Sequence, residues 1–214
     1  MPDLAKIVSV IVYLFMASMA LWGAFSCVMV WARVAQKRFK NETLQDEFLD
    51  TVDEPLSKGD FDDATEFCEG DPRAIPQLAM LAILNRKIGF SKARQLVEDR
   101  FQRDILADLE HRLTWVHTII KSAPMVGLFG TVTGMMGAFQ QLATTENIDS
   151  QVLAENISFA LITTACGLAI AIPLIIAVAA VNIRIRKMEE LTVAGINRFL
   201  ESFQAALKIS GRKK

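Results

Sequence analysis

The chain has 214 residues, of which 52% are hydrophobic, and its 23 basic and 24 acidic side chains leave a formal net charge of −1 at pH 7. The charges are unevenly spread, because three long runs contain no Asp, Glu, Lys or Arg: Ile7–Ala32, Ser122–Thr145 and Asn156–Ile183. Apolar runs of this length between charged segments indicate membrane spans, and they exclude an ordinary soluble domain, a disordered chain and a secreted disulfide scaffold.

The first run, Ile7–Ala32, is longer than the roughly 20 apolar residues that cross a hydrocarbon core of about 30 Å. A secretory signal has an apolar core of only about 7–15 residues after a basic segment, whereas Lys6 alone precedes this run. We therefore expect a retained transmembrane helix. Its bulky apolar side chains, with Trp31 just before Arg33, are typical of a helix that faces lipid and is anchored at the interface.

The segment between the first two runs is highly charged. Residues 33–121 carry 14 basic and 17 acidic side chains, a balance that does not suggest nucleic-acid binding. Turn-forming residues divide the segment into helices: one ends near Pro55 and Gly59, a short second one ends at Gly70–Pro72 and Pro76, and a third covers Leu78–Lys87.

A longer helix follows, and Ser91 is predicted to cap its start at Lys92. One apolar stripe recurs at spacings of three and four and runs on toward the membrane. Residues 92–142 are then expected to form one rod of about 75 Å that Pro124 at most kinks. The alternative is two helices that meet near Ser122. The stripe comprises Leu96, Val97, Phe101, Ile105, Leu109, Leu113, Val116 and Ile120.

The second and third runs differ from the first, because each has one narrow face of small residues and threonine. Residues 127–137 include four glycines, which lower helix stability in water and therefore require a packing reason. Thr163 lies beside the small face of the third run. At spacings of four, three and four, the faces comprise Gly127, Thr131, Gly134 and Ala138 in the second run and Ala160, Thr164, Gly167 and Ala171 in the third.

Two interpretations of these faces are about equally supported by the residues alone. In the first, the threonine hydroxyls bond to backbone carbonyls of their own helices inside a packed bundle. In the second, the threonines line a path for a partner helix or for hydrated ions.

The positive-inside rule orients the spans. Basic residues follow the first run and the third, whereas Glu146, Asp149 and Glu155 are the only charges between the second and third runs. The amino terminus is therefore predicted outside and the carboxyl tail inside. The predicted segments are an outer terminus at 1–6, a first span at 7–32, an inner helical region at 33–115, a second span at 116–143, an outer loop at 144–155, a third span at 156–183 and an inner helix and tail at 184–214.

Motifs of enzymes and metal sites are missing from the sequence. It contains no GxxxxGK[ST], HExxH or GxSxG pattern, and its three cysteines lack metal-ligand spacing. We therefore expect no catalytic residues, no bound cofactor and no metal, and a structural role for His111 and His117. No span contains a carboxylate, so the chain lacks an intramembrane proton carrier of its own.

The sequence GLFGTVTGMM from Gly127, followed by ALITTACGLAIAIP from Ala160, closely resembles the MotA/TolQ/ExbB proton-channel family, and the ExbB/TolQ branch fits best. Three spans, an outer amino terminus, a large helical inner loop and a short outer loop fit the same family. The segment LSKGDF at Leu56–Phe61 also resembles a helical segment of that loop. The resemblance implies an all-α membrane protein whose long helices extend into a cytoplasmic helical domain.

The resemblance further implies a homopentamer in the lipid bilayer of the bacterial inner membrane. It would enclose the single-span helices of two ExbD/TolR-like subunits, whose aspartate relays protons and so couples the proton-motive force to mechanical work or transport. Thr131 and Thr164 match family threonines that face this aspartate, and this match favours the interpretation in which the threonines line a path. Thr163 is assigned to the same ion pathway. The residues expected to face the pore or partner are Gly127, Gly134, Ala138, Ala160, Gly167 and Ala171.

The sequence departs from the family at one position. ExbB and TolQ place a glutamate immediately before the Ala-Leu-Ile of the third span, where this chain has Phe159. Glu155 lies one helical turn outward and is a candidate acidic residue on the periplasmic side. The sequence does not choose among uptake, envelope integrity, gliding and export, and protons are preferred over sodium only by resemblance. A structural scaffold for a single-span partner is the alternative function.

Overall fold

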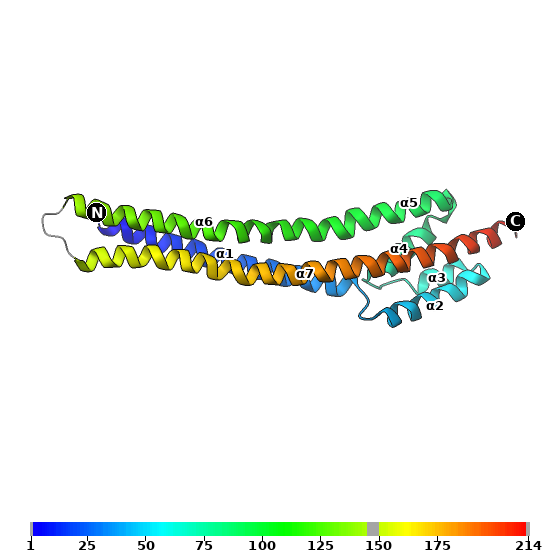
Figure 1. Cartoon of the computed structure of the whole chain (residues 1–214). Coiled ribbons are helices and arrows are strands. Elements are labelled where there is room, and N and C mark those ends of the chain that lie inside the picture. Colours follow the sequence, from blue (N-terminus) through cyan, green and yellow to red (C-terminus); the bar gives the residue numbers. More distant parts are fainter. Residues whose placement is uncertain (1, 145–149, 213–214) are drawn as a thin grey trace. The chain divides into compact units, whose positions relative to one another are not determined.

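The computed structural model describes residues 2–144 and 150–212, and it is all-α, since no strand occurs among those residues (Figure 1). The elements are α1 (Pro2–Lys37), α2 (Glu42–Lys58), α3 (Phe61–Glu66), α4 (Ala74–Leu84), the 3-10 helix η1 (Arg86–Ile88), α5 (Phe90–Arg100), the π-helix η2 (Phe101–Leu106), α6 (Ala107–Thr144) and α7 (Ser150–Arg212). Within these described residues, three helical stretches are long and apolar enough to cross a membrane: Ile7–Lys37, Phe90–Gln140 and Leu153–Ser210.

The chain divides into two compact units, to each of which α1, α6 and α7 contribute. The apolar unit comprises Met1–Met29 and Arg112–Ala180, and the charged unit comprises Val30–His111 and Val181–Lys214.

In the apolar unit, α1 packs on both other helices at Gly23. A Cβ atom there would lie 2.8 Å from Leu174 Cδ1 and 3.3 Å from Ile119 Cγ2, so only glycine fits without movement. The outward side of α1 carries large exposed side chains, which suits contact with lipid. They include Ile11, Leu14, Phe15, Leu21, Trp22, Phe25 and Val28.

The charged unit has a mixed aliphatic and aromatic core. Phe203 of α7 stacks on Phe199 with ring centroids 5.8 Å apart and meets the edge of Phe61 of α3 at 6.2 Å. These rings and the apolar faces of α2 and α4 hold the short helices against α7. Further buried core residues are Leu49, Val52, Leu56, Ile75, Leu78, Ile83 and Met188.

The predicted helix ends in the charged unit are partly confirmed. Gly59 ends α2 in the left-handed conformation, with φ at 80°, and its N–H donates to Leu56 O, as expected for a C-terminal glycine cap. The prediction that Pro76 closes the preceding helix is wrong. Pro76 lies in the first turn of α4, where a missing N–H costs no helical hydrogen bond.

The long helix toward the second apolar run is continuous from 90 to 144, so the alternative of two helices meeting near Ser122 is wrong. Its predicted start is also wrong, because α5 begins at Phe90 with Gly89 in the capping position at φ 91°. Ser91 therefore lies inside the first turn of α5 and is not its N-cap residue. The apolar stripe is buried as predicted from Val97 to Val116, and the π-turn at 101–106 adds Leu106 to it.

Candidate ion-pathway site

The second and third apolar runs pack against each other at their glycines. A Cβ on Gly127 of α6 would lie 2.7 Å from Thr163 O and 3.0 Å from Thr164 Cα of α7. A Cβ on Gly167 of α7 would lie 2.6 Å from Ala123 O of α6. Because these neighbours are backbone atoms that cannot swing away, the two helices approach this closely only with glycine at both positions.

The small residues that the sequence singled out are all buried in the single chain. The glycines among them make contacts between α6 and α7 of the same subunit. For example, a Cβ added to Gly134 would lie 3.0 Å from the Cβ of Ala160. Their role toward a pore or a partner chain stays a prediction. The six buried residues are Gly127, Gly134, Ala138, Ala160, Gly167 and Ala171.

Thr131 and Thr164 form the polar centre of this helix pair. Their hydroxyl groups are hydrogen-bonded to each other across 33 positions of sequence. Thr131 also donates toward Ala160 O at 3.1 Å and toward Gly127 O at 3.3 Å, and Thr164 donates toward Gly127 O at 3.2 Å. Both side chains are half-buried.

This arrangement offers more acceptors than protons. Two hydroxyls supply two protons, which two carbonyls and the opposite hydroxyl can accept. Each hydroxyl can therefore rotate from one acceptor to another without leaving its proton unpaired. Such a pair can donate to an approaching carboxylate or accept from its protonated form, while hydrogen bonding within the subunit is maintained in the absence of water.

Thr163 differs from the pair. It is fully buried, its hydroxyl donates to Ala160 O at 2.9 Å, and its side chain fills the space left by Gly130, whose Cβ would lie 2.5 Å from Thr163 Oγ1. The structure thus gives Thr163 a packing contact, and its predicted place in the ion pathway stays a prediction.

Phe159, at the position of the family's glutamate, lies in an aromatic contact. Its ring meets Tyr13 of α1 edge-on with centroids 5.6 Å apart, and its Cδ1 lies 3.1 Å from the Cβ position of Gly134. An aromatic ring thus lies between Tyr13 and Gly134 at this position. Glu155 is exposed, one turn away on α7.

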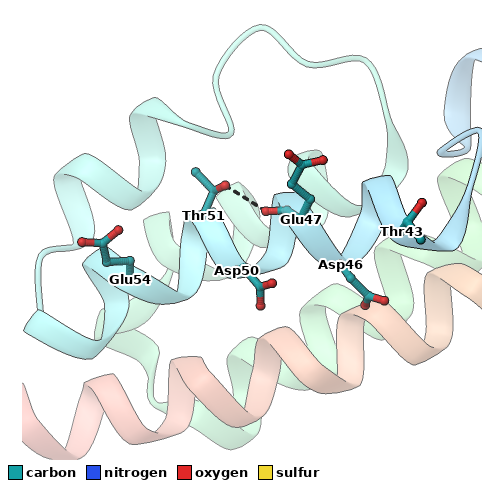
Figure 2. Close-up of a pocket in the computed structure, with 6 residues that line it drawn as sticks. All are labelled: Thr43, Asp46, Glu47, Asp50, Thr51 and Glu54. Atoms are coloured by element: carbon teal, nitrogen blue, oxygen red, sulfur yellow. Dashed lines mark hydrogen bonds between the residues drawn. The ribbon is translucent and has the colours of Figure 1, made fainter.

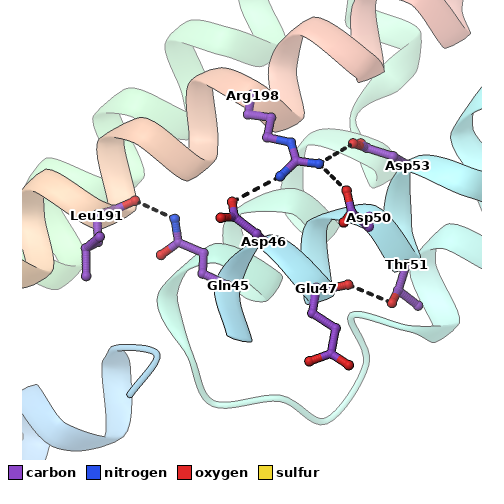
Figure 3. A network of polar contacts seen from close by, with 8 residues as sticks. All are labelled: Gln45, Asp46, Glu47, Asp50, Thr51, Asp53, Leu191 and Arg198. Carbon is purple, nitrogen blue, oxygen red and sulfur yellow. Dashed lines mark hydrogen bonds and ion pairs between the residues drawn. The ribbon is translucent and has the colours of Figure 1, made fainter. Parts of the chain in front are cut away.

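A second polar cluster, in the charged unit, was not predicted from the sequence. Arg198 of α7 lies among three carboxylates of α2, with Asp46 Oδ1 at 3.0 Å, Asp53 Oδ2 at 3.5 Å and Asp50 in direct ion-pair contact (Figure 3). The hydrogen bond to Asp50, with the charges of all three carboxylates, raises the pKa of Arg198. The spacing of the three aspartates by four and three residues on one helix face was the available sequence signal.

The same helix carries a surface depression of about 500 Å³ with four carboxylates around it, those of Asp46, Glu47, Asp50 and Glu54 (Figure 2). Asp46 and Asp50 are partly neutralised by Arg198, and Glu54 pairs with Lys58 at 2.7 Å, which lowers the pKa of Glu54. A buried amide tether adjoins this cluster, since Gln45 donates to Leu191 O of α7 at 2.8 Å. The cluster therefore fastens α2 to α7.

Three apolar helical stretches, two of them joined by a close glycine–threonine contact, define a multi-pass membrane protein. Residues 74–201 match the MotA/TolQ/ExbB proton channel family, and the chain belongs to that family. This is a family of channel components rather than enzymes.

Curated relatives agree with this assignment. The chain is 36% identical over 115 residues to the biopolymer transport protein ExbB of Helicobacter pylori, which covers 54% of this chain and 77% of the relative. It is 34% identical over 102 residues to the Tol-Pal system protein TolQ of Haemophilus influenzae, covering 48% of this chain and 43% of TolQ. The TolQ of Pseudomonas aeruginosa is 39% identical over 99 residues, with 46% and 41% covered. The predicted placement near the ExbB/TolQ branch is therefore confirmed.

Proposed function

We propose that the chain is the stator-like subunit of an inner-membrane motor driven by the proton-motive force. The observation that carries this proposal is the half-buried hydroxyl pair of Thr131 and Thr164. It lies in a chain that belongs to a family of proton channels. An aspartate on an ExbD/TolR-like single-span partner would approach the pair and exchange hydrogen bonds with it as it gains and loses a proton. The partner must supply this carboxylate, since none lies in the apolar runs of this chain.

The proposed assembly is a homopentamer that surrounds two copies of the partner. The amino terminus is placed in the periplasm and the carboxyl terminus in the cytoplasm, as the basic residues after Ala32 and Ile183 support. Proton flow would then do mechanical work or drive transport across the envelope.

The test is partner-dependent proton flux in proteoliposomes. Thr131→Val with Thr164→Val removes both hydroxyls but keeps the side-chain volume, and flux is expected to fall to the level of liposomes without the partner. Thr133→Val is the matched control, because among the described residues the Thr133 hydroxyl donates only to carbonyls of its own helix, Phe129 O at 3.0 Å and Gly130 O at 3.1 Å. The double variant must still co-purify with the partner. Wild-type flux in that intact complex would refute the proposal.

Glu155 is proposed to attract protons at the periplasmic entrance. It is exposed and lies on α7 four residues before Phe159. Glu155→Gln is expected to reduce flux severalfold at neutral pH while leaving assembly unchanged. We propose that the ion is the proton, and flux that persists when potassium replaces sodium would support this.

A structural scaffold is the second candidate function. The burial of the small residues favours it, because Gly127, Gly134 and Gly167 are already used in contacts between α6 and α7 of one subunit. A scaffold would hold a single-span partner whether or not that partner carries its aspartate, and it would conduct no ions. Flux measured with an Asp→Asn partner in an intact complex separates the two functions.

A further inference from the structure

A cleft lined by cations lies in the charged unit between the end of α1 and the segment formed by η2 and the start of α6. Its volume is about 440 Å³. Two buried apolar side chains, Ile105 and Leu109, form part of its lining, together with three cations and two carboxylates.

The cations come from both sides of the cleft. The Arg33 side chain is 47% exposed and its guanidinium lies 3.2 Å from Asp108 Oδ2. Lys37, one turn further along α1, donates to Gln77 Oε1 at 2.8 Å. Arg103 projects from the π-helix and is exposed.

The two carboxylates of the lining each have a cation beside them. Asp108 accepts from Arg33, and Asp104 lies 2.6 Å from Arg100 Nε on the preceding helix. When the opposite charges within each of these two pairs are cancelled, the positive charges of Lys37 and Arg103 remain. The cleft therefore has an excess of positive charge and suits an anion.

The place of the cleft in the sequence connects it to the membrane surface. Arg33 is the first charged residue after the run Ile7–Ala32. Trp31 lies two residues before Arg33, and the guanidinium of Arg184 stacks over its ring, 3.5 Å from the ring centroid. A tryptophan paired with arginine at the end of an apolar run marks the bilayer interface, so in the proposed topology the cleft opens at the cytoplasmic leaflet.

We propose that this cleft binds the phosphate of an anionic phospholipid of the cytoplasmic leaflet, with Lys37 and Arg103 as the cations that contact it. Basic recesses beside transmembrane helices at the cytoplasmic side suit such headgroups. The position beside the interfacial Trp31–Arg184 pair favours a lipid over a soluble phosphate, because a phospholipid headgroup reaches the cleft while its acyl chains stay in the bilayer. The inference rests on the proposed membrane orientation, but it does not depend on proton conduction.

The full chain, purified in mild detergent, is incubated with phosphatidylglycerol or with phosphatidylcholine of the same acyl chains, and native mass spectrometry measures the bound fraction. Phosphatidylglycerol is expected to bind preferentially. Each cation near an anionic lipid surface contributes about fivefold in affinity, so Lys37→Gln with Arg103→Gln is expected to weaken binding by about 25-fold. Lys92→Gln with Arg94→Gln removes the same charge elsewhere in the charged unit and is expected to change binding little.

Three results would overturn the proposal: equal binding of the two lipids, equal loss in both double variants, or displacement of phosphatidylglycerol by an equal concentration of inorganic phosphate. The last would identify a soluble anion as the ligand. Proton flux is measured separately, so a chain that binds the lipid without conducting would contradict only the proposed function.

Discussion

The hydroxyl groups of Thr131 and Thr164 meet between α6 and α7, where Gly127 lets the two backbones come close enough for both to share one carbonyl. The polar pair and the close packing are thus one feature. A hydroxyl pair held this way needs no water to satisfy it, which suits a position inside a membrane where a partner's charge comes and goes.

A double-mutant cycle on the two threonines tests whether the contact is energetically coupled. Thr131→Val and Thr164→Val each remove the shared hydrogen bond, so the double variant should lose less stability than the two single losses added together. The expected coupling is about 0.6 kcal/mol and at most about 1.7 kcal/mol, as for other hydrogen bonds between membrane helices. Reversible unfolding in mixed micelles measures it. Strict additivity would contradict the contact.

Glycine substitutions test the close approach. Gly127→Ala places a Cβ 2.7 Å from the carbonyl oxygen of Thr163, which cannot move without shifting α7, and should destabilise the apolar unit by about 1–3 kcal/mol. Gly137→Ala is the matched control on the same helix, since its nearest heavy atoms lie at 3.8 Å, an ordinary contact distance. Unfolding of the two variants in the same micelles gives the comparison, and equal stability would contradict the packing described above.

The sequence predicted the helices well where composition decides the outcome. Charge-free runs require helices in lipid, and the stripe from Val97 to Val116 follows directly from helical periodicity. Helix starts were less predictable. Ser91 has a suitable capping side chain, but Gly89 allows the positive φ that starts the helix earlier, and backbone conformation at a glycine leaves no mark on residue spacing.

The site was predictable as a set of residues but not as a set of contacts. The equal spacing on two helices identified the small faces, yet only the structure shows them buried against each other with Thr163 inside and Thr131 and Thr164 at the edge. The cluster around Arg198 was missed because its partners lie more than 140 positions away in sequence. A charge pattern on one helix does not identify the cation that matches it.

Arg198→Gln is expected to loosen α2 from α7. Three carboxylates that share one guanidinium would then repel one another, and Asp53 Oδ1, buried and without a hydrogen-bond partner, would lose the nearby charge. Because these groups are partly exposed, the loss should be about 1–2 kcal/mol and should shrink with added salt. Hydrogen exchange in the intact protein should become faster in Glu42–Lys58 and stay unchanged in Ala74–Leu84. Arg94→Gln, which removes only the exposed pair with Glu98, should affect neither segment.

Cys68 is expected to make stability depend on alkaline pH. The side chain is 1% exposed, and burial, with a smaller contribution from Asp71, raises the pKa of its thiol to about 12 from 9.0. The folded thiol stays protonated where the unfolded one ionises. Its contribution is therefore fully present below about pH 9 and is lost as the pH rises toward 12, by up to about 1.4 kcal/mol per pH unit.

The measurement compares the wild-type chain with Cys68→Ala between pH 8 and pH 10.5, both in a background with Cys27→Ala and Cys166→Ala. Contributions from all other ionisable groups are common to both proteins and cancel in the difference. The stability advantage of Cys68 should shrink steadily above pH 9. An advantage that stays constant to pH 10.5 would mean that the thiol ionises equally easily in the folded and unfolded chains, contrary to its burial.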